Sequence, residues 1–247
     1  GRQDSEFEHH QLWPMGPAGL RFELRHVLRK RWGNGLAYRL WMTLASIVLL
    51  PWMLLEKLLR PVESSWSWWL SAYLKGRSLA RQKPFDLIYS TGGAFAAHLA
   101  AHALKRATGT CWLAEVHDPM VMPGKRPTTA QEKMQFKIEG QICSDADIAI
   151  WFTDQALASA RQRHPQLGER GKMMLPGIDN PFKRLPPYRP GKKFVIGHFG
   201  SLSPTRHLGP IICALELLFD RRPQLKEVVE LHVYGGPLDS VSVSLLG

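Results

Sequence analysis

From Phe85 onward, short apolar runs alternate with longer amphipathic segments. The apolar runs predict strands at 85–90, 110–116, 146–152 and 172–176, one that begins at Phe194, and one at 229–234. The segments between them predict helices at 94–106, 129–143, 154–163 and 210–219. Strand–helix alternation with short loops is typical of a parallel sheet covered by helices on both faces. The pattern therefore predicts a doubly wound α/β architecture.

Two of these helices carry recognisable start signals. Thr129 and Glu132 have the spacing of a capping box, in which each side chain bonds the backbone N–H of the other residue. Thr153 and Asp154 predict the cap of the next helix.

The stretch from Asn180 to Lys193 breaks the alternation. It contains four prolines with basic residues among them, which is typical of an interdomain linker. We therefore expect a first domain at 1–180, a linker at 181–193 and a second domain at 194–247. One strand–helix–strand unit cannot bury a parallel sheet alone, so we expect the second domain to be truncated.

The segment before Phe85 has a different pattern. Residues 21–31 are strongly basic, residues 40–55 form an uncharged run, and Trp66, Trp68 and Trp69 follow. A spanning helix needs about 20 apolar residues, and Pro51 interrupts this shorter run. A basic stretch, a short apolar helix and clustered tryptophans favour a helical insertion, at about 21–80, on an anionic membrane surface. A membrane span, or a buried helical hairpin whose tryptophans fill a core, is the alternative.

Charge and cysteine content narrow the class of partner. The net charge of +11 favours anionic partners such as nucleotide phosphates or acidic lipids, and nucleic acid is a less favoured partner. Three scattered cysteines without zinc spacing predict a reducing compartment and no structural metal. The polar residues from Gly1 to His10 are no signal peptide, and the absence of an initiator methionine predicts a trimmed start.

Common catalytic motifs do not occur: G-x-G-x-x-G, the P-loop, G-x-S-x-G and H-E-x-x-H are all absent. Two polar groups remain at predicted strand ends, where open α/β sheets bind ligands. His117 and Asp118 suit proton transfer or the binding of a sugar hydroxyl, although Asp118 is equally suited to turn the chain before a proline. Gly200, Ser201 and Arg206 suit an anion through backbone N–H groups, hydroxyls and a guanidinium, with a solvated turn as the alternative.

The order of these pieces resembles the family 4-like glycosyltransferases. The carrying segments are FDLIYSTGGAFAAHLAAHALKRATGTCWLAEVHDP, SDADIAIWFTDQALASA with GKMMLPGIDNPF, FVIGHFGSLSPTRHLGPIICALELL, and LHVYGG. They cover about residues 85–236. The resemblance implies the GT-B fold, in which two Rossmann-like domains face each other across a catalytic cleft. It also implies a nucleotide-sugar donor, a glycan or lipid-linked acceptor and no bound metal or other cofactor.

The resemblance also implies roles for single residues. Gly200, Ser201 and Arg206 match the loop that holds the donor diphosphate, with serine where arginine is frequent and arginine where lysine is usual. His117 and Asp118 match the catalytic strand end.

Gly92 and Gly93, a weaker version of the same turn, and Asp179 are the expected substrate contacts. The family's paired glutamates would follow Gly247, so this chain alone is expected to be inactive.

These features predict a glycosyltransferase that makes surface polysaccharide or glycolipid, retains configuration by family analogy, and works in the cytoplasm at the inner face of the membrane. No nucleic-acid partner is expected. Two alternatives remain open. One is a non-enzymatic membrane-associated scaffold with a degenerate GT-B fold, and the other is a nucleotide-sugar epimerase.

Overall fold

The computed structural model describes residues 8–92, 95–122, 124, 126–177, 187, 191–203 and 206–246. The chain divides into two compact units, Gly1–Ile178 and Asp179–Gly247, which are treated separately below. The predicted linker lies mostly outside the described residues.

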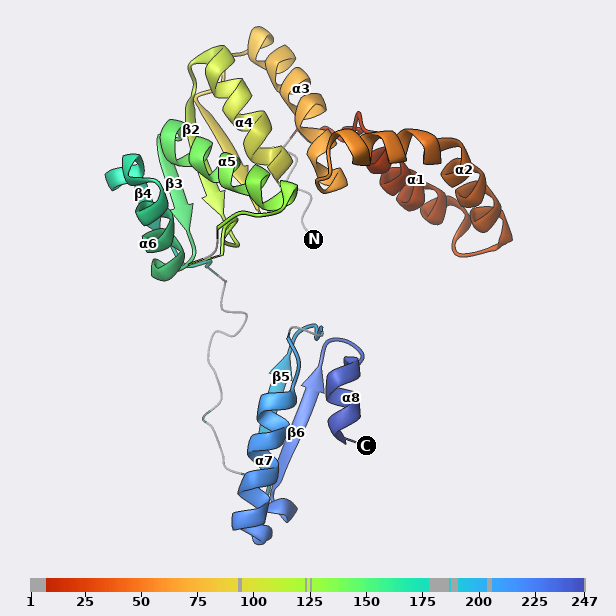
Figure 1. The fold of residues 1–247 in the computed structure, drawn as a ribbon, viewed down its shortest axis with the longest axis vertical. Helices are drawn as coiled ribbons and strands as arrows, with labels where there is room; N and C mark the ends of the chain where they lie inside the picture. The colour runs from red at the N-terminus through yellow and green to blue at the C-terminus, as the bar shows by residue number, and fades with distance from the viewer. Residues whose placement is uncertain are drawn as a thin grey trace. The chain divides into compact units, whose positions relative to one another are not determined.

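Unit 1 contains a four-stranded parallel sheet (Figure 1). Its strands are β1 (Leu87–Thr91), β2 (Cys111–Val116), β3 (Ile148–Trp151) and β4 (Gly171–Met173), in that spatial order. They are joined by α4 (Phe95–Thr108), α5 (Ala130–Asp145), α6 (Asp154–Arg163) and the 3₁₀ helix Pro165–Arg170. Mixed α/β structure with a parallel sheet is confirmed, and it is compatible with a Rossmann-like fold.

The core of unit 1 lies on one face of this sheet. Ile88, Trp112 and Val116 are buried there in one cluster with apolar side chains of α4, α5 and α6. On the other face, the side chains of Leu87 and Tyr89 are about half exposed, at 50% and 53%. Right-handed crossovers between sequential neighbours return over the same face, which places all three helices in one layer. The described strands are therefore wound in one direction, without the reversal of strand order that a doubly wound sheet contains.

Local caps fix where two helices begin. The Thr129 side chain accepts a hydrogen bond from Glu132 N, and the Glu132 carboxylate accepts one from Thr129 N, so the predicted capping box is confirmed. Thr153 Oγ1 accepts from Ala156 N at 3.2 Å, which confirms the second cap.

The segment before the sheet is helical: α1 (Pro17–Trp32), α2 (Leu36–Leu59), the 3₁₀ helix Ser64–Ser67 and α3 (Trp68–Gln82). α3 packs on α4, and a Cβ at Gly76 would lie 3.0 Å from Leu104 Cδ2. The predicted interruption at Pro51 is wrong, because α2 continues through it. Proline inside a helix removes one backbone donor and clashes with the carbonyl one turn earlier, a cost of about 3 kcal/mol that the rest of this 24-residue helix outweighs.

The buried hairpin is also not found in the described part of unit 1. Only 6% of the most apolar 18-residue window of α2 is buried, and by length and composition this helix is able to cross a membrane. Trp66, Trp68 and Trp69 are instead partly buried beside the hairpin.

Unit 2 contains β5 (Phe194–Phe199) and β6 (Val229–Tyr234), a parallel pair in the register Phe194 to Val229. α7 (Gly209–Arg221) and the 3₁₀ helix Pro223–Glu227 connect them, and α8 (Ser240–Leu246) follows. Phe194 and Phe199 of β5 are 62% and 77% exposed.

Candidate functional site

Three side chains meet at the carboxyl-terminal edge of the unit 1 sheet. Thr91 ends β1 and is the register partner of Glu115 in β2. Thr91 Oγ1 donates to Glu115 Oε1 at 2.9 Å, and His117 Nε2 lies 2.6 Å from that oxygen and 2.9 Å from Thr91 Oγ1. Two adjacent strand ends therefore build one polar cluster, Thr91–Glu115–His117. This is the edge where parallel sheets bind ligands.

The imidazole of His117 is held in a defined orientation. Its ring stacks on Phe152, with the ring centroids 4.6 Å apart, and Phe152 directly follows β3. An ionised carboxylate can only accept hydrogen bonds, so the contact with Glu115 requires that Nε2 of His117 carries the hydrogen. Nδ1 makes no hydrogen bond within the described residues, and the His117 side chain is 41% exposed. The ring can therefore accept a proton or a hydroxyl hydrogen bond at Nδ1.

The Glu115 carboxylate is stabilised in its charged form. The hydroxyl of Tyr89 donates to Glu115 Oε2, and this bond is the main cause that lowers the pKa of Glu115, with further bonds from Thr91 and His117. The same bond raises the pKa of Tyr89. An ionised Glu115 therefore lies beside His117 and accepts the hydrogen bond of its Nε2–H group.

A buried chain of hydrogen bonds holds the turn that follows Thr91. Trp112 Nε1 donates to Ser90 Oγ at 2.8 Å, Ser90 Oγ lies 2.9 Å from His98 Nδ1, and His98 Nε2 lies 3.1 Å from the carbonyl oxygen of Gly92. Burial lowers the pKa of His98, so the neutral ring donates through Nε2 to Gly92. Gly92 has φ of 104°, which a residue with a side chain rarely adopts.

The remaining residues predicted for the site, up to residue 180, are Asp118, Gly93 and Asp179. The side chain of Asp118 is exposed and joins no hydrogen bond within the described part of unit 1, so the structure does not bring it into the cluster. Gly93 and Asp179 lie outside the described residues.

In unit 2, two glycines meet at the carboxyl ends of β5 and β6. Gly200 N donates to Tyr234 O at 2.9 Å, and Gly200 and Gly235 have φ of 143° and 138°. A Cβ at Gly235 would lie 2.5 Å from the carbonyl oxygen of Gly200. The loop after β5 therefore depends on glycine at both positions.

Several backbone N–H groups of the predicted cradle are already bonded within the protein, although these bonds do not involve Ser201 N or Leu202 N. Ser203 N donates to Arg206 O at 3.0 Å and Arg206 N to Ser203 O at 2.9 Å, which closes a turn. At the start of α7, Leu208 N donates to Ser242 Oγ and Gly209 N to His207 Nδ1. These N–H groups are already bonded within the protein, and α8 supplies one of the acceptors.

The side chain of Arg206 remains available, together with a hollow of about 310 Å³. Arg206 and His198 line this hollow beside apolar side chains of β5 and α7. His198 Nε2 is shielded from solvent and has no hydrogen-bond partner among the described residues. A guanidinium and an unpaired imidazole nitrogen fit an anionic group with an apolar neighbour. Ser201 is exposed on the same loop.

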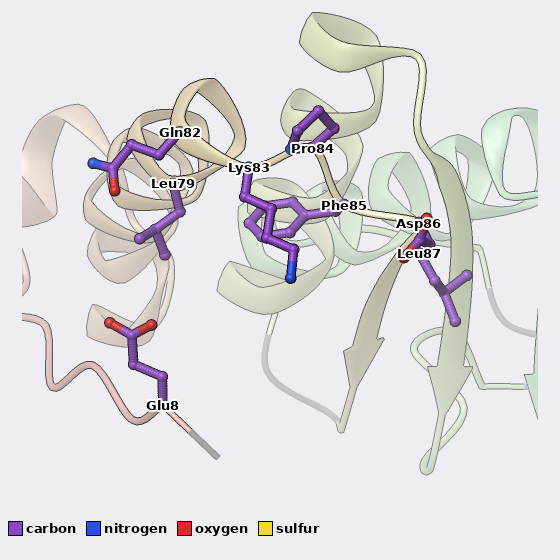
Figure 2. Close-up of a pocket in the computed structure, with 8 residues that line it drawn as sticks. All are labelled: Glu8, Leu79, Gln82, Lys83, Pro84, Phe85, Asp86 and Leu87. Atoms are coloured by element: carbon purple, nitrogen blue, oxygen red, sulfur yellow. The ribbon is translucent and has the colours of Figure 1, made fainter. Parts of the chain in front are cut away.

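A larger hollow of about 540 Å³ lies elsewhere in unit 1 (Figure 2). It is lined mainly by the end of α3 and by residues 83–87, which lead into β1 (Figure 2). This is the amino-terminal end of the strand, opposite the edge that carries Glu115 and His117. Among the described residues, no three His, Cys, Asp or Glu side chains gather so that they could hold a metal ion.

Sequence reasoning missed Glu115, Thr91, Tyr89 and His198. Glu115 had a local signal, because residues two apart in a strand point to the same side and Glu115 precedes His117 by two. Thr91 required the register of β1 against β2, which local patterns do not specify. Comparison with models of known protein families finds no match for this chain, and comparison with curated proteins finds none either.

Proposed function

We propose that the protein is a GT-B glycosyltransferase, which transfers a sugar from a nucleotide-sugar to a glycan or lipid-linked acceptor. The cluster of Thr91, Glu115 and His117 carries the proposal, because it presents an oriented imidazole, backed by an ionised carboxylate, at the ligand-binding edge of a parallel sheet. The order of sequence motifs along both units supports it.

In this proposal unit 1 handles hydroxyl groups. His117 Nδ1 accepts the hydrogen bond of a sugar or acceptor hydroxyl, while Nε2 stays bonded to Glu115. Glu115 keeps the ring in one tautomer and stabilises positive charge on it as the hydroxyl proton leaves. Transfer with retention of configuration follows from family analogy.

Unit 2 binds the donor. Arg206 pairs with the diphosphate, His198 Nε2 donates a second hydrogen bond when protonated, and the apolar wall of the hollow contacts the nucleoside. Ser203 N, Arg206 N and the N–H groups at the start of α7 are already bonded, so these amides do not contribute to the phosphate contact.

The same observation favours a second candidate, a scaffold that keeps the fold without binding nucleotide-sugars. The turn in which Ser203 and Arg206 bond each other's backbone needs no ligand to satisfy these two amides. The scaffold predicts no response to any nucleotide-sugar.

Isothermal titration of the 247-residue chain with UDP- and GDP-linked sugars tests the proposal. We expect one nucleotide class to bind, and Arg206→Ala to weaken binding about 10- to 100-fold, the loss of a charge-assisted hydrogen-bonded contact. Arg221→Ala removes an exposed arginine at the end of α7 and should leave affinity unchanged.

Two results would contradict the proposal: no binding of either class, or equal weakening by both substitutions. If the donor binds, incubation of a chain that continues past Gly247 with labelled donor, followed by product analysis, separates a transferase from an epimerase.

A further inference from the structure

The helices α1 and α2 form an antiparallel hairpin (Figure 1). At its base, Ala18 N donates to Glu56 Oε2 at 2.9 Å, and in its middle Arg21 Nε donates to Ser46 Oγ at 2.9 Å. Near the connecting turn, the rings of Trp32 and Trp41 stack with centroids 6.2 Å apart. The hairpin is therefore a defined pair of helices.

One face of α2 is continuously apolar and exposed. Residues three or four apart share a helix face. They form the α2 stripe, with exposed fractions of 51–79%: Leu36, Leu40, Leu44, Ile47, Leu54 and Leu58. Met42, which is buried, and Ser46 face α1 instead. The stripe carries no charged side chain over the whole length of the helix, and such a surface rarely stays in water.

Cationic side chains lie on the neighbouring helix α1, and one of them, Arg21, lines a shallow hollow together with Ile47 of the stripe. Arg21, Arg25 and Arg29 are spaced by four residues on α1 and are exposed. Residues 17–60 contain eight Lys and Arg against two Glu, a net charge of +6. An apolar face beside a row of cations matches the layered chemistry of an anionic bilayer, with acyl chains below phosphate head groups.

We propose that the α1–α2 hairpin lies in the surface of an anionic lipid bilayer, with the α2 stripe among the acyl chains and the α1 arginines on the head groups. This inference stands independently of the sugar chemistry. The occupant of the apolar face is lipid.

A second copy of the chain is the less favourable occupant. Joining two α2 stripes would bring two hairpins of +6 each into contact, and the cations of the two hairpins would repel one another. Anionic lipid covers the same face and neutralises those cations at the same time.

A spanning orientation is also less favourable. At 24 residues α2 is about 36 Å long, which is sufficient to cross a bilayer. α1, however, is paired with α2 and carries six charged side chains, five of them cationic. Crossing would take those charges into hydrocarbon or break the hairpin. An in-plane position leaves them at the phosphates.

The hairpin is tied firmly to the rest of unit 1. Glu56 Oε1 accepts from Trp66 Nε1 at 3.0 Å, and the guanidinium of Arg60 lies 4.7 Å from the centre of a Trp66 ring. A Cβ at Gly16 would lie 2.4 Å from Glu56 Oε1, so the chain approaches this carboxylate closely. Lipid binding by the hairpin would therefore hold unit 1 at the membrane.

Vesicle flotation of the full chain tests the proposal. We expect the protein to float with vesicles of phosphatidylcholine mixed with phosphatidylglycerol, and much less with phosphatidylcholine alone. Arg25→Gln with Arg29→Gln should weaken binding about 30-fold, from about 1 kcal/mol per cation at the surface. The control is Lys133→Gln with Lys137→Gln, an exposed pair with the same spacing on α5, which should change nothing.

The apolar contact needs its own variants. Ile47→Asp with Leu54→Asp should lower binding about 100-fold or more, because two aliphatic side chains that the bilayer would bury are replaced by charged ones. Leu217→Asp, at a position 59% exposed on α7, is the matched control. All these positions are exposed, so unchanged circular dichroism and melting show that the fold is intact.

Four results would overturn the proposal. They are equal flotation with neutral and anionic vesicles, equal loss in the control variants, a lipid-free dimer that Ile47→Asp with Leu54→Asp dissociates, and protease access to α1 only from the opposite side of sealed vesicles. Salt-sensitive flotation with access to α1 from the side of addition supports the in-plane hairpin.

Discussion

Replacing Gly235 by alanine should loosen unit 2 at the loop that carries Arg206. The new Cβ would lie 2.5 Å from the carbonyl oxygen and 2.8 Å from the carbonyl carbon of Gly200, both backbone atoms. The φ of 138° adds strain of about 1–2 kcal/mol, and forced overpacking adds about 1–3 kcal/mol. We expect a loss of about 2–5 kcal/mol in the local stability of the β5–β6 pair.

Gly236→Ala is the matched control one residue away. A Cβ at Gly236 meets nothing within 4 Å. It should change stability by less than about 1 kcal/mol, in the stabilising direction, because alanine reduces the entropy of the unfolded chain.

Hydrogen exchange measured by mass spectrometry on the full chain reads this difference locally. Peptides from β5 and β6 should exchange about 30-fold faster or more in Gly235→Ala, while β1 peptides of unit 1 serve as the internal reference. Equal exchange in the two alanine variants would refute the close approach of Gly200 and Gly235. Faster exchange in β1 would mean that the two units do not unfold separately.

Three further predictions concern unit 1. Burial lowers the pKa of His98 below its usual 6.5, so the unfolded chain binds the proton first and the stability from the neutral ring is lost as the pH falls below about 6.5. In urea melts, the free energy of unfolding of the wild type should exceed that of His98→Gln by a margin that shrinks between pH 7.5 and 5. A constant margin would contradict this. Thr129→Ala should cost about 1 kcal/mol by removing the cap of α5, seen as faster exchange in its first turn alone. Glu139→Ala should lower the free energy of unfolding by about 3–5 kcal/mol, because Glu139 is 1% exposed and its bidentate partner Arg163 would be left unpaired. A double variant, Glu139→Met with Arg163→Met, should be more stable than Glu139→Ala when melted. Equal stability of the two variants would count against this reasoning.

Local patterns predicted the parts of the fold that depend on local physics. Every predicted strand formed, β4 ending three residues earlier than its apolar run, and the caps at Thr129 and Thr153 formed as expected. Pro51 was misjudged, because the local cost of a proline, about 3 kcal/mol, does not decide whether a 24-residue helix continues.

The site could be predicted only in part, because its contacts join distant residues. His117 was found from its place after a strand, but Thr91 reaches it across 26 positions. The partner of Leu208 N is Ser242, 34 positions away on α8, so the sequence around Gly200 did not reveal that these amides are occupied. The prediction for Arg206 concerns a side chain rather than an amide, and Arg206 lines the hollow in unit 2.

Photoaffinity labelling with an azido-uridine or azido-guanosine diphosphate sugar tests the central proposal most directly. We predict that peptides between residues 194 and 211, around Arg206 and His198, carry the label, and that the unlabelled nucleotide-sugar prevents it. Two results would contradict the assignment of unit 2 as the donor-binding half. One is labelling at residues 83–87 that the unlabelled nucleotide-sugar prevents, and the other is labelling that it prevents at no site.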